Sequence, residues 1–91
     1  MIQRVVRVEN ELGLHARAAA SLVKLTARFE SNIKLSRLNN NQEIDGKSIL
    51  GILLLAAARG AEVKVTVDGS DEEVAMESIV NLFKKRFGEA E

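Results

Sequence analysis

The chain has 91 residues, a length that suits one domain, and its 13 basic residues balance 13 acidic ones. A chain without net charge lacks the basic excess that drives binding to phosphate backbones, so we expect no nucleic-acid partner. Cysteine is absent, which excludes a disulfide scaffold and a thiolate metal site. We predict neither a bound metal nor a cofactor.

The longest apolar run covers residues 52–58 and is far shorter than the ~20 residues that cross a bilayer. The first residues alternate polar and apolar side chains, without a basic leader ahead of an apolar run. We therefore expect no signal peptide and no insertion into a membrane. These observations predict a cytoplasmic protein with a single domain over residues 1–91, and we expect it to be a monomer.

The first predicted elements are a strand at residues 2–8 and a helix at residues 16–29. The strand is rich in β-branched residues. The helix has one apolar face and one polar stripe at helical spacing. The apolar face combines Ala16, Ala19, Ala20, Val23 and Ala27 with Leu22, Leu25 and Phe29, and the polar stripe consists of Arg17, Ser21, Lys24 and Arg28.

The middle of the chain predicts a hairpin followed by a helix. Residues 32–38 and 42–45 are its two strands, and Asn39-Asn40-Asn41 is the turn between them. The helix at residues 47–58 is apolar on nearly all sides, and a small domain cannot bury such a helix completely. We therefore expect some of its apolar side chains to be exposed as a partner surface, among them Ile49, Leu50 and Leu53.

The last predicted elements are a strand and a helix. Valine at every second position of residues 63–67 is typical of a half-buried strand. Ser70 and Glu73 have the spacing of a capping box, and Gly88 is predicted to end the helix. The order β-α-β-β-α-β-α predicts an α+β fold, an open-faced β-sandwich in which a four-stranded antiparallel sheet carries three helices on one face.

His15 directly precedes the first predicted helix and lies at its N-cap or beside it. Histidine is not a preferred cap, and a residue that departs from a local preference is a candidate for function. Free backbone N–H groups and the positive end of the helix dipole favour a phosphate at this place. A neutral imidazole has the lone pair needed to attack phosphorus, and Arg17 adds a charged donor for phosphoryl oxygens.

Local spacing by itself leaves a plainer interpretation open. A lone histidine beside a glycine is most often a surface or loop-packing residue, and Arg17 alone is more often a solvated helix residue. The run Gly46-Lys47-Ser48 suggests a P-loop, but Asn41 stands where that motif requires a glycine. We therefore reject a nucleotide-binding loop.

Two motifs lie on matching elements of the predicted order: Gly13-Leu14-His15-Ala16-Arg17 and Lys47-Ser48-Ile49-Leu50-Gly51. Together with that order they resemble the HPr family, the histidine-containing phosphocarrier proteins of the bacterial phosphoenolpyruvate-dependent phosphotransferase system. The resemblance covers essentially the whole chain. It implies a phosphoryl relay that acts with partner proteins rather than a free-standing enzyme.

The resemblance also implies roles for single residues. His15 is expected to accept, at Nδ1, the phosphoryl group of Enzyme I and to pass it to EIIA-type domains, while Arg17 stabilises the phosphoryl group. Ser48 is expected to be the regulatory site of HPr kinase/phosphorylase, although a serine near a helix start is most often only a cap. The surface for Enzyme I and EIIA-type domains is expected to comprise Ala20, Lys24, Ile49, Leu50 and Leu53.

Ala18 departs from the family, which usually has proline directly after the active-site arginine. Alanine leaves one more free N–H donor and a looser helix start. Within the family, a regulatory or nitrogen-related branch is the alternative to sugar transport. A ligand-sensing, ACT-like module would share a small α+β architecture, but it does not call for a histidine at a helix start.

Overall fold

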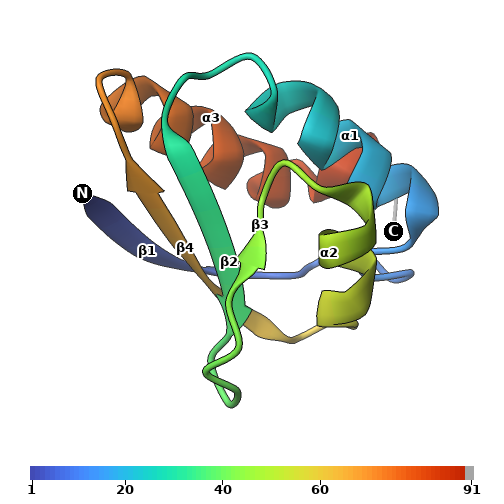
Figure 1. Cartoon of the computed structure of the whole chain (residues 1–91). Coiled ribbons are helices and arrows are strands. Elements are labelled where there is room, and N and C mark those ends of the chain that lie inside the picture. Colours follow the sequence, from blue (N-terminus) through green and yellow to red (C-terminus); the bar gives the residue numbers. More distant parts are fainter. Residues whose placement is uncertain (90–91) are drawn as a thin grey trace.

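The computed structural model describes residues 1–89. Three α-helices in this range cover one face of the sheet (Figure 1), which confirms the predicted α+β fold. The elements are β1 (Ile2–Arg7), α1 (Ala16–Thr26), β2 (Asn32–Arg37), β3 (Ile44–Asp45), α2 (Ile49–Leu55), β4 (Glu62–Asp68), α3 (Glu72–Lys84) and the short 3-10 turn η1 (Arg86–Gly88).

The strands of this range form one antiparallel sheet in the order β1-β4-β2-β3. β4 lies between β1 and β2, and its Val65 is opposite Arg4 of β1 and Leu35 of β2. β3 has two residues and pairs only with β2, so the predicted return strand at residues 42–45 is shorter than expected. The turn between β2 and β3 is closed by a hydrogen bond of 3.0 Å from Asn40 N–H to the Arg37 carbonyl.

The core lies between the sheet and the helices. Val63, Val65 and Val67 of β4 are fully buried, as their alternation predicts. Leu22 of α1 and Phe83 of α3 are buried above them. Each large apolar side chain that is fully buried contributes ~1.5–3 kcal/mol, so this layer stabilises the fold and holds the helices on one face. None of the helices within residues 1–89 combines the length and the apolar character needed to cross a bilayer.

The helices are shorter than the predicted ones. α1 ends at Thr26 instead of residue 29, because the Arg28 and Phe29 amides bond three residues back and tighten the chain into a turn. α2 covers Ile49–Leu55 instead of residues 47–58, because Ala56 adopts a left-handed backbone with φ 52°. α3 ends at Lys84, before the predicted stop at Gly88.

The buried face of α1 also differs from the predicted one. Four side chains are buried, namely Ala18, Ala19, Leu22 and Thr26. Three alanines assigned to the apolar face are exposed instead, namely Ala16, Ala20 and Ala27. Alanine is tolerated in the core and on the surface alike, so an alanine-rich helix marks its inner face weakly. The buried Thr26 hydroxyl is satisfied by donating to the Gly46 carbonyl at 2.8 Å.

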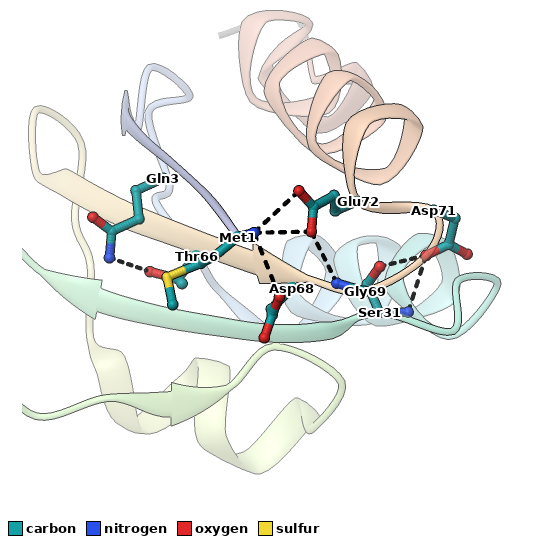
Figure 2. Close-up of polar contacts among 8 residues, drawn as sticks. All are labelled: Met1, Gln3, Ser31, Thr66, Asp68, Gly69, Asp71 and Glu72. Carbon is teal, nitrogen blue, oxygen red and sulfur yellow. Dashed lines mark hydrogen bonds and ion pairs between the residues drawn. The ribbon is translucent and has the colours of Figure 1, made fainter.

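The predicted capping box of Ser70 and Glu73 is wrong. The N-cap of α3 is Asp71, and within the described chain its side chain makes no capping hydrogen bond to the helix. The Gly69 N–H, two residues ahead of the N-cap, donates instead to Glu72 Oε1 at 3.1 Å (Figure 2).

Asp71 is drawn away from its own helix by the loop between α1 and β2. Its carboxylate accepts hydrogen bonds from the Ser31 N–H at 3.0 Å, from the Ser31 hydroxyl, and from the Glu30 N–H at 2.8 Å. Figure 2 shows Ser31 and Asp71 facing each other at this junction. The tertiary contact therefore takes the carboxylate that would otherwise cap the helix, and it ties the start of α3 to the loop between α1 and β2.

Candidate functional site

His15 is the N-cap residue of α1, as the sequence predicts. Its backbone is extended, with φ −76° and ψ 179°, and its carbonyl accepts the Ala19 N–H at 2.8 Å. The Arg17 backbone N–H points back to Nδ1 of the ring at 3.3 Å. The imidazole thus takes the place of the small polar side chain that usually caps a helix, and it stays 26% exposed.

Glu89 meets the other nitrogen of the His15 ring. The Nε2 atom lies 2.6 Å from Glu89 Oε2, slightly shorter than the ~2.7–2.9 Å that is usual for an N–H donor on a charged acceptor. The short turn η1, which directly precedes Glu89, packs against α1. Sequence reasoning missed Glu89, because the two residues are 74 positions apart and no motif contains Glu89.

Asn10 holds the Glu89 carboxylate from the opposite side. Its Nδ2 group donates to Glu89 Oε1 at 3.0 Å and to the Gly13 carbonyl at 2.7 Å, and the side chain is fully buried. Among the residues that the structure describes, its Oδ1 atom has no hydrogen-bond partner. Sequence reasoning missed Asn10 as well. The Asn10 side-chain amide thus uses its N–H donors to hold Glu89 and the loop ahead of His15, while its oxygen is unpaired among the described residues. We therefore assign Asn10 to the site rather than to the apolar core.

Glu89 is ionised at neutral pH. Burial alone would raise the pKa of this carboxyl, whose side chain is only 12% exposed. Hydrogen bonds from His15 and Asn10, together with electrostatic attraction by His15 and Arg17, outweigh burial and hold the pKa of Glu89 below its ordinary value. The His15 ring therefore faces a fixed negative charge.

A left-handed turn brings Glu89 to the ring. Arg86, Phe87 and Gly88 have φ angles of 55°, 56° and 79° in succession. Residues other than glycine adopt this conformation at a cost of roughly 1–2 kcal/mol each. Packing holds the turn, because Phe87 is buried and its ring lies edge-on to Phe83 with centroids 4.9 Å apart.

The loop ahead of His15 is anchored to the segment that follows α2. The Leu14 N–H donates to the Ala57 carbonyl at 2.9 Å. Gly13 has φ +68°, and a Cβ atom on it would lie 2.7 Å from the same carbonyl oxygen. Only glycine fits this close approach without displacement, so Gly13 determines how the chain enters α1.

Arg17 is exposed and lines a pocket of about 490 Å³, which Phe87 and Glu89 also line. The structure joins Arg17 to His15 through the backbone amide described above. Over residues 1–89, no group of three or more His, Cys, Asp or Glu side chains could hold a metal ion. The candidate site therefore consists of four groups beside this pocket, namely the His15 ring, the Glu89 carboxylate, the Asn10 amide and the Arg17 side chain.

Ser48 is the N-cap of α2, and its Oγ atom accepts the Gly51 N–H at 3.0 Å. The apolar side chains after it are exposed as predicted, with exposed fractions of 44% for Ile49, 68% for Leu50 and 38% for Leu53. Leu54, which was not predicted, is 72% exposed. Ala20 and Lys24 of α1 are exposed too.

Comparisons with known proteins point to one family. Residues 2–85 match the family model described as the PTS HPr component phosphorylation site. The chain is 46% identical over 91 residues to phosphocarrier protein HPr of Cupriavidus necator, with all of both chains covered. It is 45% identical over 89 residues to phosphocarrier protein HPr of Xylella fastidiosa, with 98% of each chain covered.

Solved structures show the same likeness. The crystal structure of HPr-C-His from Thermoanaerobacter tengcongensis superposes with a TM-score of 0.94 at 36% identity, and all of both chains is covered. That of phosphocarrier protein HPr from Bacillus anthracis has a TM-score of 0.82 at 35% identity, covering 88% of this chain and 93% of the other. The chain belongs to the HPr family of phosphocarrier proteins of the phosphotransferase system.

Proposed function

We propose that this protein accepts a phosphoryl group on His15 from phosphorylated Enzyme I and passes it to EIIA-type domains. The observation that carries this proposal is the position of His15 as the N-cap of α1, with a partly exposed ring and a backbone amide at Nδ1. The protein then acts as a relay with a covalent phosphohistidine, and its turnover depends on a donor and an acceptor protein.

The chemistry of the relay needs a nucleophile and a place for negative charge. The ring nitrogen supplies its lone pair to phosphorus, and the bond between phosphorus and the donor breaks with its electrons remaining on the donor. The N-terminal amides of α1 and the guanidinium of Arg17 favour the phosphoryl oxygens. In the second transfer the acceptor attacks phosphorus and the electron pair of the N–P bond returns to His15.

Partner docking is assigned to the exposed apolar side chains of α2 together with exposed residues of α1. Ile49, Leu50 and Leu53 are the apolar part of this surface, and Ala20 and Lys24 continue it. A modest apolar surface suits a carrier, because each partner must be released quickly after transfer.

Ser48 is assigned as a regulatory phosphorylation site for HPr kinase/phosphorylase. Its side chain is partly exposed, and the exposed Ile49 and Leu50 follow it directly. A phosphate adds about −1.5 to −2 charges at neutral pH. That charge at the edge of an apolar docking surface weakens partner binding, since the charged group must lose water when the surfaces meet.

Incubation with Enzyme I and phosphoenolpyruvate, followed by intact mass measurement, tests the proposal. We expect one acid-labile phosphoryl group per chain, which His15→Ala abolishes and Ser48→Ala leaves in place. The Ser48→Ala variant is the matched control, because it removes a different candidate phosphorylation site. If an Enzyme I preparation that phosphorylates another HPr leaves this chain unmodified, the proposal fails.

A further inference from the structure

We propose that Glu89 is a positioning residue, which holds the proton of the His15 ring on Nε2 and thereby presents Nδ1 to the phosphoryl group. This inference rests on the proposed function of His15. Glu89 lies beyond residues 2–85, the segment that matches the family model, so membership of the family does not itself assign this role.

The geometry allows only one direction for the ring proton. A carboxylate is an acceptor only, so the 2.6 Å contact between Glu89 Oε2 and Nε2 requires a hydrogen on Nε2. The Arg17 amide is a donor only, and it faces Nδ1 at 3.3 Å. Both neighbours therefore favour the same tautomer, with the lone pair on Nδ1. The amide contact is long, so it is the weaker of the two.

The Glu89 carboxylate is itself held in place. Its Oε1 atom accepts a hydrogen bond from the buried Asn10 amide, which is fixed in turn to the Gly13 carbonyl. The chain of contacts runs from a buried side chain through the carboxylate to the ring. Such an arrangement orients an imidazole, as carboxylates do behind functional histidines in other sites.

The backbone that carries Glu89 supports the same role. Arg86 and Phe87 both adopt left-handed conformations that are unfavourable for residues other than glycine. Strain of this kind persists where the surrounding packing imposes it, and it is concentrated at functional sites. Here the buried Phe87 imposes it, and the result is that Glu89 is directed back onto His15.

The carboxylate also suits the charge that develops during transfer. When Nδ1 forms its bond to phosphorus and Nε2 keeps its hydrogen, the ring gains a positive charge. Glu89 faces that charge across a short hydrogen bond and stabilises it. The Nε2–H bond and the Nδ1 lone pair point in different directions from the ring, so Glu89 contacts one nitrogen while the phosphoryl group approaches the other. When the acceptor removes the phosphoryl group, the ring returns to the neutral Nε2–H form.

The experiment compares Glu89→Ala with a matched control, Glu77→Gln. Glu77 is exposed on α3, and its replacement removes one negative charge away from the site. The first measurement is the nitrogen NMR spectrum of the neutral His15 ring, which separates the two tautomers and needs no partner protein. We expect almost pure Nε2–H in the unmodified chain and in Glu77→Gln, and a mixture with the Nδ1–H form in Glu89→Ala.

The second measurement is the rate of phosphoryl transfer from phosphorylated Enzyme I. We expect Glu89→Ala to be slower by about tenfold or more, the lower end of losses seen when a carboxylate behind a functional histidine is removed. Glu77→Gln should transfer at the unmodified rate. Unchanged ring signals in Glu89→Ala, or a transfer rate equal to that of the control, would overturn the role of Glu89. Failure of the unmodified chain to accept a phosphoryl group would instead count against the proposed function, while the ring spectra would still decide whether Glu89 sets the tautomer.

Discussion

His15 and Glu89, which are 74 positions apart in the sequence, are joined by a contact of 2.6 Å between Nε2 and Oε2. One residue begins α1 and the other follows the last turn of the described chain. The candidate site is therefore formed by residues from both the beginning and the end of the described chain. Its integrity depends on the loop that enters α1, on the first turn of that helix, and on the packing that carries Glu89.

Gly13→Ala should destabilise the protein and slow transfer. The new Cβ atom would lie 2.7 Å from the Ala57 carbonyl oxygen, and φ is +68°. We expect a loss of about 1–3 kcal/mol in the free energy of unfolding, measured by urea denaturation. Gly60→Ala is the matched control, because Gly60 has φ +89° but open space around its Cβ position. If both variants lose equal stability, backbone strain rather than the close approach accounts for the effect.

Ala18→Pro should fold and should transfer faster. Ala18 is the third residue of α1, where the backbone N–H has no helical partner, so proline removes no helical hydrogen bond. Its ring fixes the backbone beside the Arg17 amide that faces His15. We expect a gain of roughly two- to fivefold in rate, equivalent to ~0.4–1 kcal/mol, because the fixed backbone keeps the Arg17 amide in place beside His15. Because Ala18 is fully buried, circular dichroism and urea denaturation must accompany the rate measurement. Identical rates would mean that Ala18 is neutral at this position.

Ser48→Asp should slow phosphorylation of His15 by Enzyme I by about tenfold, equivalent to ~1.4 kcal/mol. Aspartate caps a helix as well as serine does, so the hydrogen bond to the Gly51 amide has a replacement acceptor. What changes is the charge beside the exposed Ile49 and Leu50. The control is Ser48→Asn, which keeps a capping side chain without charge and should transfer at the normal rate. Equal rates for the two variants would argue against an electrostatic switch at Ser48.

The contact between Asp71 and Ser31 should make the free energy of unfolding depend on pH in the acidic range. Hydrogen bonds from the Ser31 hydroxyl and the Glu30 and Ser31 amides outweigh the loss of hydration and hold the pKa of Asp71 below its ordinary value of 3.8. Because the pKa is lower in the folded state, the stabilisation is fully present above 3.8 and is lost as the pH falls through the folded-state pKa.

Asp71→Ala should therefore be less stable than the unmodified protein at neutral pH, and the difference should narrow as the pH falls below 3.8. Urea denaturation at a series of pH values measures this difference. Glu73→Ala is the control, since it removes an exposed carboxylate from the start of the same helix. If the difference in the free energy of unfolding between Asp71→Ala and the unmodified protein stays constant down to strong acid, the ionisation of Asp71 does not contribute to stability.

Much of the fold could be predicted from local patterns. Alternating valines in residues 63–67 identified the central strand, because a sheet with one covered face imposes a period of two. The position of His15 at the start of a helix was also predictable, because the apolar periodicity begins directly after it. The exposure of apolar side chains on α2 was predictable too, because the helix has more apolar side chains than a small domain can bury.

Other features could not be predicted from the local sequence. Which alanines of α1 face the core depends on how the helix rotates around Leu22, since alanine itself has little preference. The start of α3 depends on Ser31, which draws Asp71 away from the helix. In both cases a contact distant in sequence outweighed a local preference worth about 1 kcal/mol or less.

The candidate site also has one part that could be predicted from the sequence and one part that could not. The sequence by itself indicated the family, the histidine proposed to carry the phosphoryl group and the helix that begins beside it, since these depend on short-range spacing. Only the tertiary structure decided what surrounds the ring, because Asn10 and Glu89 meet there through burial and a strained turn. Hydrogen bonds between distant residues leave no periodic signal along a chain. The carboxylate at Nε2 is therefore visible only in the folded protein.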